Sequence, residues 1–127
     1  FLPIDRENAR NALTTINAAA DLIRAHECSF AIYPEGTRSK SGELLPWHAG
    51  SLKIAQKANV PIVICSLVNS RAILRNMFRK HTEVWLDVLD VIPAEELAGK
   101  TTIEVGERVH AVMEAGVVRR EQAQGLR

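Results

Sequence analysis

The nine residues 60–68, VPIVICSLV, are a near-continuous apolar run rich in β-branched side chains. Such a run is typical of a strand that is buried on both faces, as in a parallel sheet. A helix is predicted directly before it, from near Gly50 to Asn59, with Leu52 and Ile54 on its apolar face. This part of the chain therefore predicts a helix that leads into a central strand.

Three further elements are predicted after the central strand. RAILRNMFRKH, residues 71–81, has the spacing of a helix, and TEVWLDVLDVI, residues 82–92, alternates like a strand. The predicted strand faces are Val84, Leu86 and Val88 on one side and Trp85, Asp87 and Leu89 on the other. Thr101 and Glu104 have the spacing of a capping box, so a last helix is expected to begin at this point. The polar residues after Arg119, REQAQGLR, are expected to fray.

The residues before the central strand predict one more helix and one more strand. Asp5 is the expected N-cap of the helix. Its apolar residues recur at steps of three and four: Ala9, Ala12, Leu13, Ile16, Ala19, Ala20 and Ile23. SFAIY, residues 29–33, is predicted as a short buried strand that ends at Pro34. Helices and strands alternate, which favours an α/β fold with a mostly parallel sheet covered by helices.

The composition limits the possible functions. The 127 residues are enough for one domain, and 16 Lys and Arg against 15 Asp and Glu leave a net charge of only +1. This balance gives no general field for binding nucleic acid. Cys28 and Cys65 lack the spacing of zinc ligands and are expected to be reduced core thiols in a cytosol-facing protein. No apolar run approaches the roughly 20 residues that span a bilayer. Because the chain starts at Phe1, we expect a part of a longer protein.

PEGTR, residues 34–38, lies where ligands gather in such sheets, just beyond the carboxyl end of a predicted strand. Gly36 permits a tight turn, and Thr37 and Arg38 supply a hydroxyl and a guanidinium fork suited to phosphate. Glu35 is expected to hold the fork or the backbone in place, or to bind a substrate hydroxyl. The same residues also fit a surface turn with one ion pair of minor energy. Both interpretations stay open on chemistry alone.

Other catalytic sets fit poorly. A nucleotide-binding P-loop is excluded because Gly42 is followed by Glu43, and there is no Gly-x-Ser-x-Gly elbow. His26 and Cys28 do not converge as a ligand pair, and His81 and His110 are expected at the surface or an edge. Among the four histidines, only His48, which is close to PEGTR in sequence, is a candidate for a functional role. A structural role is the alternative.

The predicted helix at residues 71–81 carries a separate signal. Arg71, Arg75 and Arg79 recur every four residues, beside the apolar residues Ile73, Leu74, Met77 and Phe78. A helix of this kind can lie at a membrane interface. It can equally pack on a core with its charged face in solvent.

Four ordered blocks of the sequence belong together: IDR at 4–6, YPEGTRS at 33–39, SGELLPWHAGS at 41–51 and VPIVICSL at 60–67. In this order they resemble the glycerolipid acyltransferases, the family of 1-acyl-sn-glycerol-3-phosphate acyltransferase. The resemblance implies an α/β acyltransferase fold that is truncated at its N-terminus. It also implies a partial acyltransferase domain over residues 1–118, followed by a polar tail over residues 119–127.

The resemblance implies a reaction in phospholipid biosynthesis. A fatty acyl group would pass from acyl-CoA or acyl carrier protein to the free hydroxyl of lysophosphatidic acid and give phosphatidic acid, with no cofactor. Glycerol-3-phosphate or another lysophospholipid is the alternative acceptor. The expected location is the cytoplasmic face of a membrane, peripheral or anchored by upstream segments.

The resemblance also assigns roles to residues of this chain. Arg6 and Arg38 would bind the phosphate of the acceptor, and Glu35, Gly36 and Thr37 would shape that pocket. His48 stands where the family commonly has a lysine, and a protonated histidine would replace part of that cationic contact.

The catalytic motif of the family, His-x-x-x-x-Asp, is not found in the 127 residues. The residues five places after the four histidines are Ala31, Lys53, Leu86 and Ala115. We therefore expect the catalytic base to lie upstream and this chain to be inactive alone. A non-catalytic phosphate- or phospholipid-binding module is the alternative if the natural protein truly lacks the motif.

Overall fold

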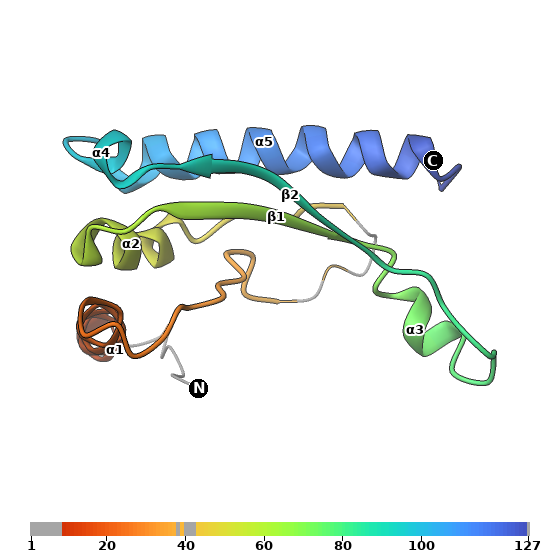
Figure 1. The fold of residues 1–127 in the computed structure, drawn as a ribbon, viewed down its shortest axis with the longest axis horizontal. Coiled ribbons are helices and arrows are strands. Elements are labelled where there is room, and N and C mark those ends of the chain that lie inside the picture. Colours follow the sequence, from red (N-terminus) through yellow and green to blue (C-terminus); the bar gives the residue numbers. More distant parts are fainter. Residues whose placement is uncertain (1–8, 38, 40–42, 127) are drawn as a thin grey trace.

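The computed structural model describes residues 9–37, 39 and 43–126. Its elements in chain order are α1 (Ala9–Arg24), the 3-10 helix η1 (Ala49–Leu52), α2 (Lys53–Ala58), β1 (Ile62–Val68), α3 (Ala72–Arg75), β2 (Trp85–Ile92), α4 (Ala94–Leu97) and α5 (Thr102–Ala123). Figure 1 shows α5 running along the strand pair, with α1 on the far side of β1 and α2. The α/β character expected from the sequence is present in these elements.

The sheet differs from the expected one. Within the described residues it has two strands, and β1 pairs with β2 in antiparallel register, from Ile62 opposite Ile92 to Val68 opposite Trp85. The expected parallel pairing is absent from this part of the chain because residues 69–84 project beyond the end of β1 and return there, whereas a parallel pair needs a connection that runs back along the sheet (Figure 1). A bulge falls between Ile64 and Cys65.

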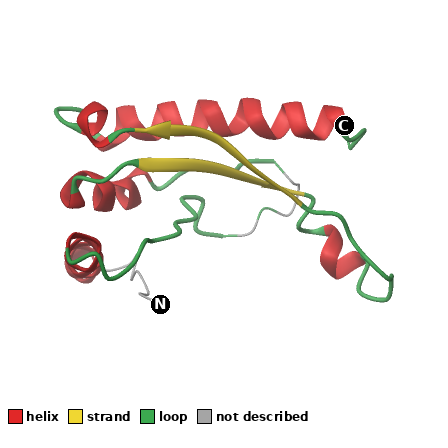
Figure 2. Ribbon diagram, viewed as in Figure 1, coloured by secondary structure: helices red, strands yellow, loops and turns green. Residues whose placement is uncertain are grey.

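Residues 29–33 were expected as a strand but are loop in the structure (Figure 2). The strand prediction is wrong here because these residues do not join the ladder of β1 and β2. Apolar alternation alone does not make a strand, since its backbone groups need a neighbouring strand to bond to. The backbone amide of Gly36 instead donates to the carbonyl of Tyr33, at 2.9 Å, in a turn.

The central strand is buried on one face only. Ile64, Ser66 and Val68 are buried, whereas the intervening residues of β1 are exposed. The prediction of burial on both faces is therefore wrong for this structure, and so is the placement of the cysteines in the core. Cys28 and Cys65 are free thiols, as expected, but both are exposed.

The core lies between the covered face of the sheet and α5. Its buried members come from η1, both strands, α4 and α5: Leu52, Ile64, Ile92, Leu97, Val105 and Val109. The helix before β1 ends at Asn59, as predicted, where a left-handed φ of 55° stops it. These contacts fix η1, which follows the segment that contains PEGTR, against α5.

Helix α5 begins as predicted and ends later than expected. The Thr101 hydroxyl accepts from the amide of Glu104, and the Glu104 carboxylate accepts from the amide of Thr101, which completes the capping box. The helix then continues to Ala123. The expectation of fraying directly after Arg119 is wrong, because Arg120 forms a two-pronged ion pair with Asp87 of β2.

Residues 71–81 do not form the predicted helix. α3 is a single turn, and only Ala72 in this segment is buried. A helix this short has little support unless one face packs on a core. The prediction that the arginines form a stripe along one helix is therefore wrong, although all three arginines are exposed.

Candidate functional site

The PEGTR segment opens with a tight turn. The amide of Gly36 donates to the carbonyl of Tyr33, at 2.9 Å, which places Pro34 and Glu35 at the centre of the turn. Gly36 has a φ of 66°, in the left-handed region that glycine adopts at little cost. The predicted need for glycine at this position is thus confirmed by the backbone. A backbone of this shape can approach a ligand closely.

Glu35 ties this turn to the segment that follows it. Its Oε2 accepts a hydrogen bond from the backbone amide of Leu45, at 2.9 Å, in a partly buried position. Holding the backbone is one of the three roles that the sequence left open for Glu35, and this bond is present among the described residues. The partner is a backbone amide, so no side-chain pattern marked Leu45 in advance.

A second bond closes the base of the loop. The amide of His48 donates to the carbonyl of Pro34, at 3.0 Å. The loop from Pro34 to His48, which we call the PEGTR loop, therefore starts and ends at the same place. His48, separated from PEGTR by the nine residues 39–47 in sequence, is brought beside it.

His48 leads directly into η1. Its carbonyl accepts from both the amide of Ser51, at 3.0 Å, and the hydroxyl of Ser51, at 2.9 Å, while its side chain is exposed. Next to it, the ring of Trp47 meets His110 of α5 edge to face, with centroids 5.2 Å apart and planes at 70°. This contact anchors the end of the loop to α5. It was not predicted, because a pair 63 residues apart leaves no local pattern.

The remaining predicted site residues divide into two groups. Thr37 is described and exposed, which leaves its hydroxyl accessible to a ligand. Arg6, Arg38, Asp5 and the turn at 40–42 lie outside the described residues. The structure therefore assembles Glu35, Gly36, Thr37 and His48 around one loop base.

The other candidates from the sequence do not gather at this loop. His26 follows α1 with a φ of 57°, and His81 is exposed in the β1–β2 connection. Among the described residues, no group of three His, Cys, Asp or Glu side chains is arranged to hold a metal ion. In the same part of the chain, no helix combines the length and apolar character needed to cross a bilayer.

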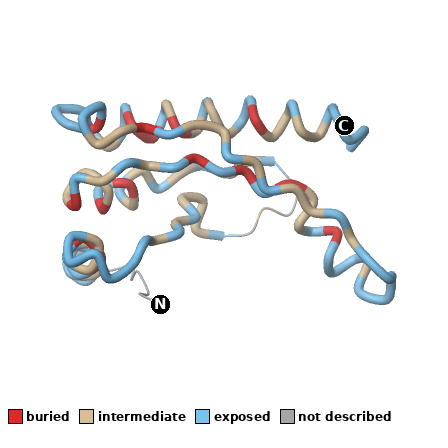
Figure 3. Tube along the Cα trace, viewed as in Figure 1, coloured by how far each residue is buried: buried red, intermediate tan, exposed pale blue. Residues whose placement is uncertain are grey.

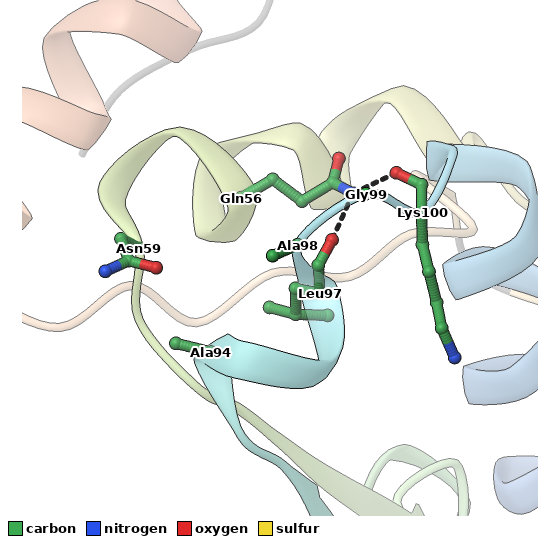
Figure 4. Close-up of a pocket in the computed structure, with 7 residues that line it drawn as sticks. All are labelled: Gln56, Asn59, Ala94, Leu97, Ala98, Gly99 and Lys100. Carbon is green, nitrogen blue, oxygen red and sulfur yellow. Dashed lines mark hydrogen bonds between the residues drawn. The ribbon is translucent and has the colours of Figure 1, made fainter.

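Two hollows are present on the described surface. A cavity of about 260 Å³ lies between α2 and α4 (Figure 4). There the Gln56 side-chain amide donates to the carbonyls of Leu97 and Lys100, at 3.3 and 2.8 Å. An open groove of about 430 Å³ runs between Trp47 and α5. The first hollow takes no residue from the PEGTR loop, and its glutamine is already used to join two elements.

The chain is similar in sequence to known acyltransferases. The acyltransferase family model matches residues 1–68, which is more than half of the chain. The chain is 30% identical over 112 residues to the human protein named 1-acyl-sn-glycerol-3-phosphate acyltransferase beta, covering 87% of this chain and 40% of that protein. It is 30% identical over 114 residues to the protein of Salmonella typhimurium named 1-acyl-sn-glycerol-3-phosphate acyltransferase, covering 89% and 46%.

A shorter match is closer in identity. The chain is 43% identical over 60 residues to the coconut protein named 1-acyl-sn-glycerol-3-phosphate acyltransferase, covering 47% of this chain and 20% of that protein. The chain spans less than half the length of these relatives. No solved structure matches it significantly. On the family match over residues 1–68, which includes the whole PEGTR loop, the chain belongs to the acyltransferase family.

Proposed function

We propose that this chain is the acceptor-binding part of an enzyme that transfers a fatty acyl group to the free hydroxyl of lysophosphatidic acid. The observation that carries the proposal is the closed PEGTR loop, in which Glu35 and the Pro34 carbonyl bind the backbone at Leu45 and His48. A loop held at its base presents its remaining polar groups in fixed positions, as recognition of a phosphate requires. The names of the relatives give the same acceptor class.

In the proposed reaction the acceptor hydroxyl attacks the carbonyl carbon of an acyl thioester. The new C–O ester bond forms, the C–S bond breaks, and the hydroxyl proton ends on the leaving thiol by way of a general base. Acyl-CoA and acyl carrier protein are the two proposed donors, and no cofactor is required. Arg38 and Arg6 are proposed to bind the acceptor phosphate, with Glu35 positioning the loop.

The base is proposed to lie outside these residues. Because no histidine of the sequence has an aspartate five places later, the 127-residue chain is expected to be inactive alone. We propose that the complete protein lies at the cytoplasmic face of a membrane. The complete protein is proposed to contain a larger, mostly parallel sheet. A structure of the complete protein in which the sheet is mostly antiparallel would contradict this fold.

The test compares the protein encoded by the natural gene with the 127-residue chain. Each is given a labelled acyl-CoA or acyl carrier protein and either lysophosphatidic acid or glycerol-3-phosphate. We expect the complete protein to form phosphatidic acid and the shorter chain to form none. If the complete protein acylates glycerol-3-phosphate and not lysophosphatidic acid, glycerol-3-phosphate would replace lysophosphatidic acid as the proposed acceptor. Turnover by the 127-residue chain would refute the proposal that the catalytic base lies outside these residues.

A second candidate arises from the missing motif. If the complete protein also lacks His-x-x-x-x-Asp, the loop fits a non-catalytic module that binds phosphate or phospholipid. Binding of lysophosphatidic acid by the complete protein, without any product, would favour that module over the enzyme.

A further inference from the structure

Residues 71–81, which we call the basic tip, project from the end of the strand pair. Figure 1 shows this connection between β1 and β2 at the lower right, away from α5. In Figure 3 the same region is coloured almost entirely as exposed. Only Ala72 within the basic tip is buried.

The backbone of the basic tip is nevertheless folded. At its base the Asn69 side-chain amide donates to the carbonyl of Glu83, at 2.9 Å, across the two strands. Within it, the amide of Asn76 donates to Ala72 and the amide of Arg79 donates to Asn76, both at 2.8 Å. Successive turns therefore hold the segment in a defined shape while its apolar side chains stay in solvent.

The exposed side chains of the basic tip are unusually large and apolar. Phe78 is 96% exposed, Leu74 79% and Met77 67%, and Ile73 is also exposed. Single exposed apolar residues are ordinary on protein surfaces, whereas several that lie together mark an interaction site. Four within six residues, at the end of a projection, fit the second case.

The charged side chains of the basic tip are all positive. Arg71, Arg75, Arg79 and Lys80 are all exposed, and residues 71–82 contain no Asp or Glu, in a chain whose net charge is only +1. In the part of the chain that the structure describes, none of these four cations belongs to an ion pair. The segment therefore offers cations to a partner rather than to the rest of the fold.

We propose that the basic tip docks this protein on an anionic phospholipid bilayer. Phe78, Met77 and Leu74 enter the boundary between headgroups and acyl chains, and the four cations bind lipid phosphates around them. Apolar side chains flanked by cations bind such surfaces by adding apolar burial to electrostatic attraction. A second copy of the tip would be repelled by its like charge. A narrow convex projection also suits a soft lipid surface better than a flat protein interface.

This proposal deepens the membrane location proposed above by assigning the surface that makes the contact. It does not depend on the acyl-transfer chemistry, because its test contains no acyl donor or acceptor. Failure of the vesicle test would therefore leave the transfer assay untouched, and the reverse is also true.

The test is co-sedimentation of the 127-residue chain with vesicles of phosphatidylcholine alone or of phosphatidylcholine and phosphatidylglycerol in equal parts. Arg75→Glu is compared with Lys53→Glu, a matched charge reversal on α2, and Phe78→Ser with Ile103→Ser, which removes an apolar side chain that is 65% exposed on α5. Circular dichroism confirms that every variant is folded.

We expect binding to the mixed vesicles, weak binding to phosphatidylcholine alone, and loss of binding at raised salt. Each basic residue near an anionic surface contributes about fivefold in affinity, so Arg75→Glu should weaken binding about thirtyfold. Phe78→Ser should weaken it about tenfold or more. The two control variants should bind like the wild type.

Three results would overturn the proposal. They are no binding of the wild type to the mixed vesicles, equal losses in the tip variants and their controls, and binding to poly-glutamate but not to vesicles, which would assign the tip to an acidic protein. A Phe78→Trp variant adds a direct readout of insertion. Its fluorescence should shift to the blue and be quenched by brominated lipid beyond the signal of Trp47 and Trp85, and an unchanged difference spectrum would also count against insertion.

Discussion

Ser66 lies on the covered face of β1 with a side chain that is fully buried. Among the described residues, its hydroxyl oxygen has no hydrogen-bond partner. A buried polar group without a partner loses its bonds to water and gains none in return. Ser66 therefore weakens the core in which it sits.

Ser66→Ala is expected to raise the free energy of unfolding of the 127-residue chain by about 1 kcal/mol, because it removes an unsatisfied hydroxyl. Urea denaturation measures the change. Ser51→Ala is the matched control, since that hydroxyl donates to the carbonyl of His48 and its loss should lower stability. A Ser66→Ala variant as unstable as the control would mean that the hydroxyl has a partner.

Asp87 makes the stability depend on pH. The hydrogen bonds from Arg120, and then its charge and that of Arg119, hold the pKa of Asp87 below its ordinary value of 3.8 against the opposing effect of burial. A carboxylate whose pKa is lower in the folded state stabilises the fold above its unfolded pKa. This contribution is lost as the pH falls through the folded value.

Asp87→Asn should therefore lower the stability near neutral pH, and the difference from the wild type should shrink as the pH falls below 3.8. Thermal melts over an acid pH series check this. A difference between the two proteins that stays constant down the whole series would show that Asp87 acts by packing and not by charge.

At the scale of elements, α5 and β2 approach closely at one glycine. A methyl group placed on Gly116 would lie only 2.4 Å from Cδ1 of Leu89. Leu89 stands at the bulge, where the register passes from Asp90 opposite Ile64 to Val88 opposite Cys65. The bulge and the glycine together set how α5 lies on the sheet.

Gly116→Ala should lower the free energy of unfolding by about 1 kcal/mol, because overlap with Leu89 outweighs the gain in helix propensity. In a Leu89→Ala background the same change should instead stabilise, by about 1 kcal/mol. A double-mutant cycle by urea denaturation measures the coupling. Equal effects of Gly116→Ala in both backgrounds would mean that the two residues do not meet.

Some of this arrangement was predictable from the sequence because it is local. The Thr101–Glu104 capping box, the strand at 62–68 and the end of the preceding helix at Asn59 depend on nearby residues alone. The pairing of two strands depends on the path of the segment that connects them, so the antiparallel return through residues 69–84 was missed. The bonds from Leu45 to Glu35 and from His48 to Pro34 use backbone amides, which leave no mark in residue type.

At the scale of the whole molecule, one face of the sheet is open. The apolar side chains on it face each other in cross-strand pairs: Val63 with Val91, Cys65 with Val88, and Leu67 with Leu86. An exposed apolar face of this kind is a site of association. It is the largest departure from the both-face burial that the central strand predicted.

The 127-residue chain is therefore expected to self-associate as its concentration rises, through this open face. Leu86→Lys should shift the equilibrium toward monomer, because a charge would be buried in the contact. Analytical ultracentrifugation at several concentrations measures it, with Leu13→Lys on α1 as the control. A wild-type chain that stays monomeric at every concentration would contradict the expectation.

The central claim is that the PEGTR loop binds the phosphate of the acceptor, and one measurement tests it most directly. kcat/KM for lysophosphatidic acid is determined with the complete protein, for wild type, Arg38→Ala, Arg38→Lys and the surface control Arg119→Ala. Charged hydrogen bonds contribute about 1.5–3 kcal/mol each, so Arg38→Ala should lose about tenfold to a hundredfold. Arg38→Lys should lose less because it keeps the charge without the fork, and Arg119→Ala should resemble the wild type. An Arg38→Ala enzyme that matches the wild type would contradict the claim.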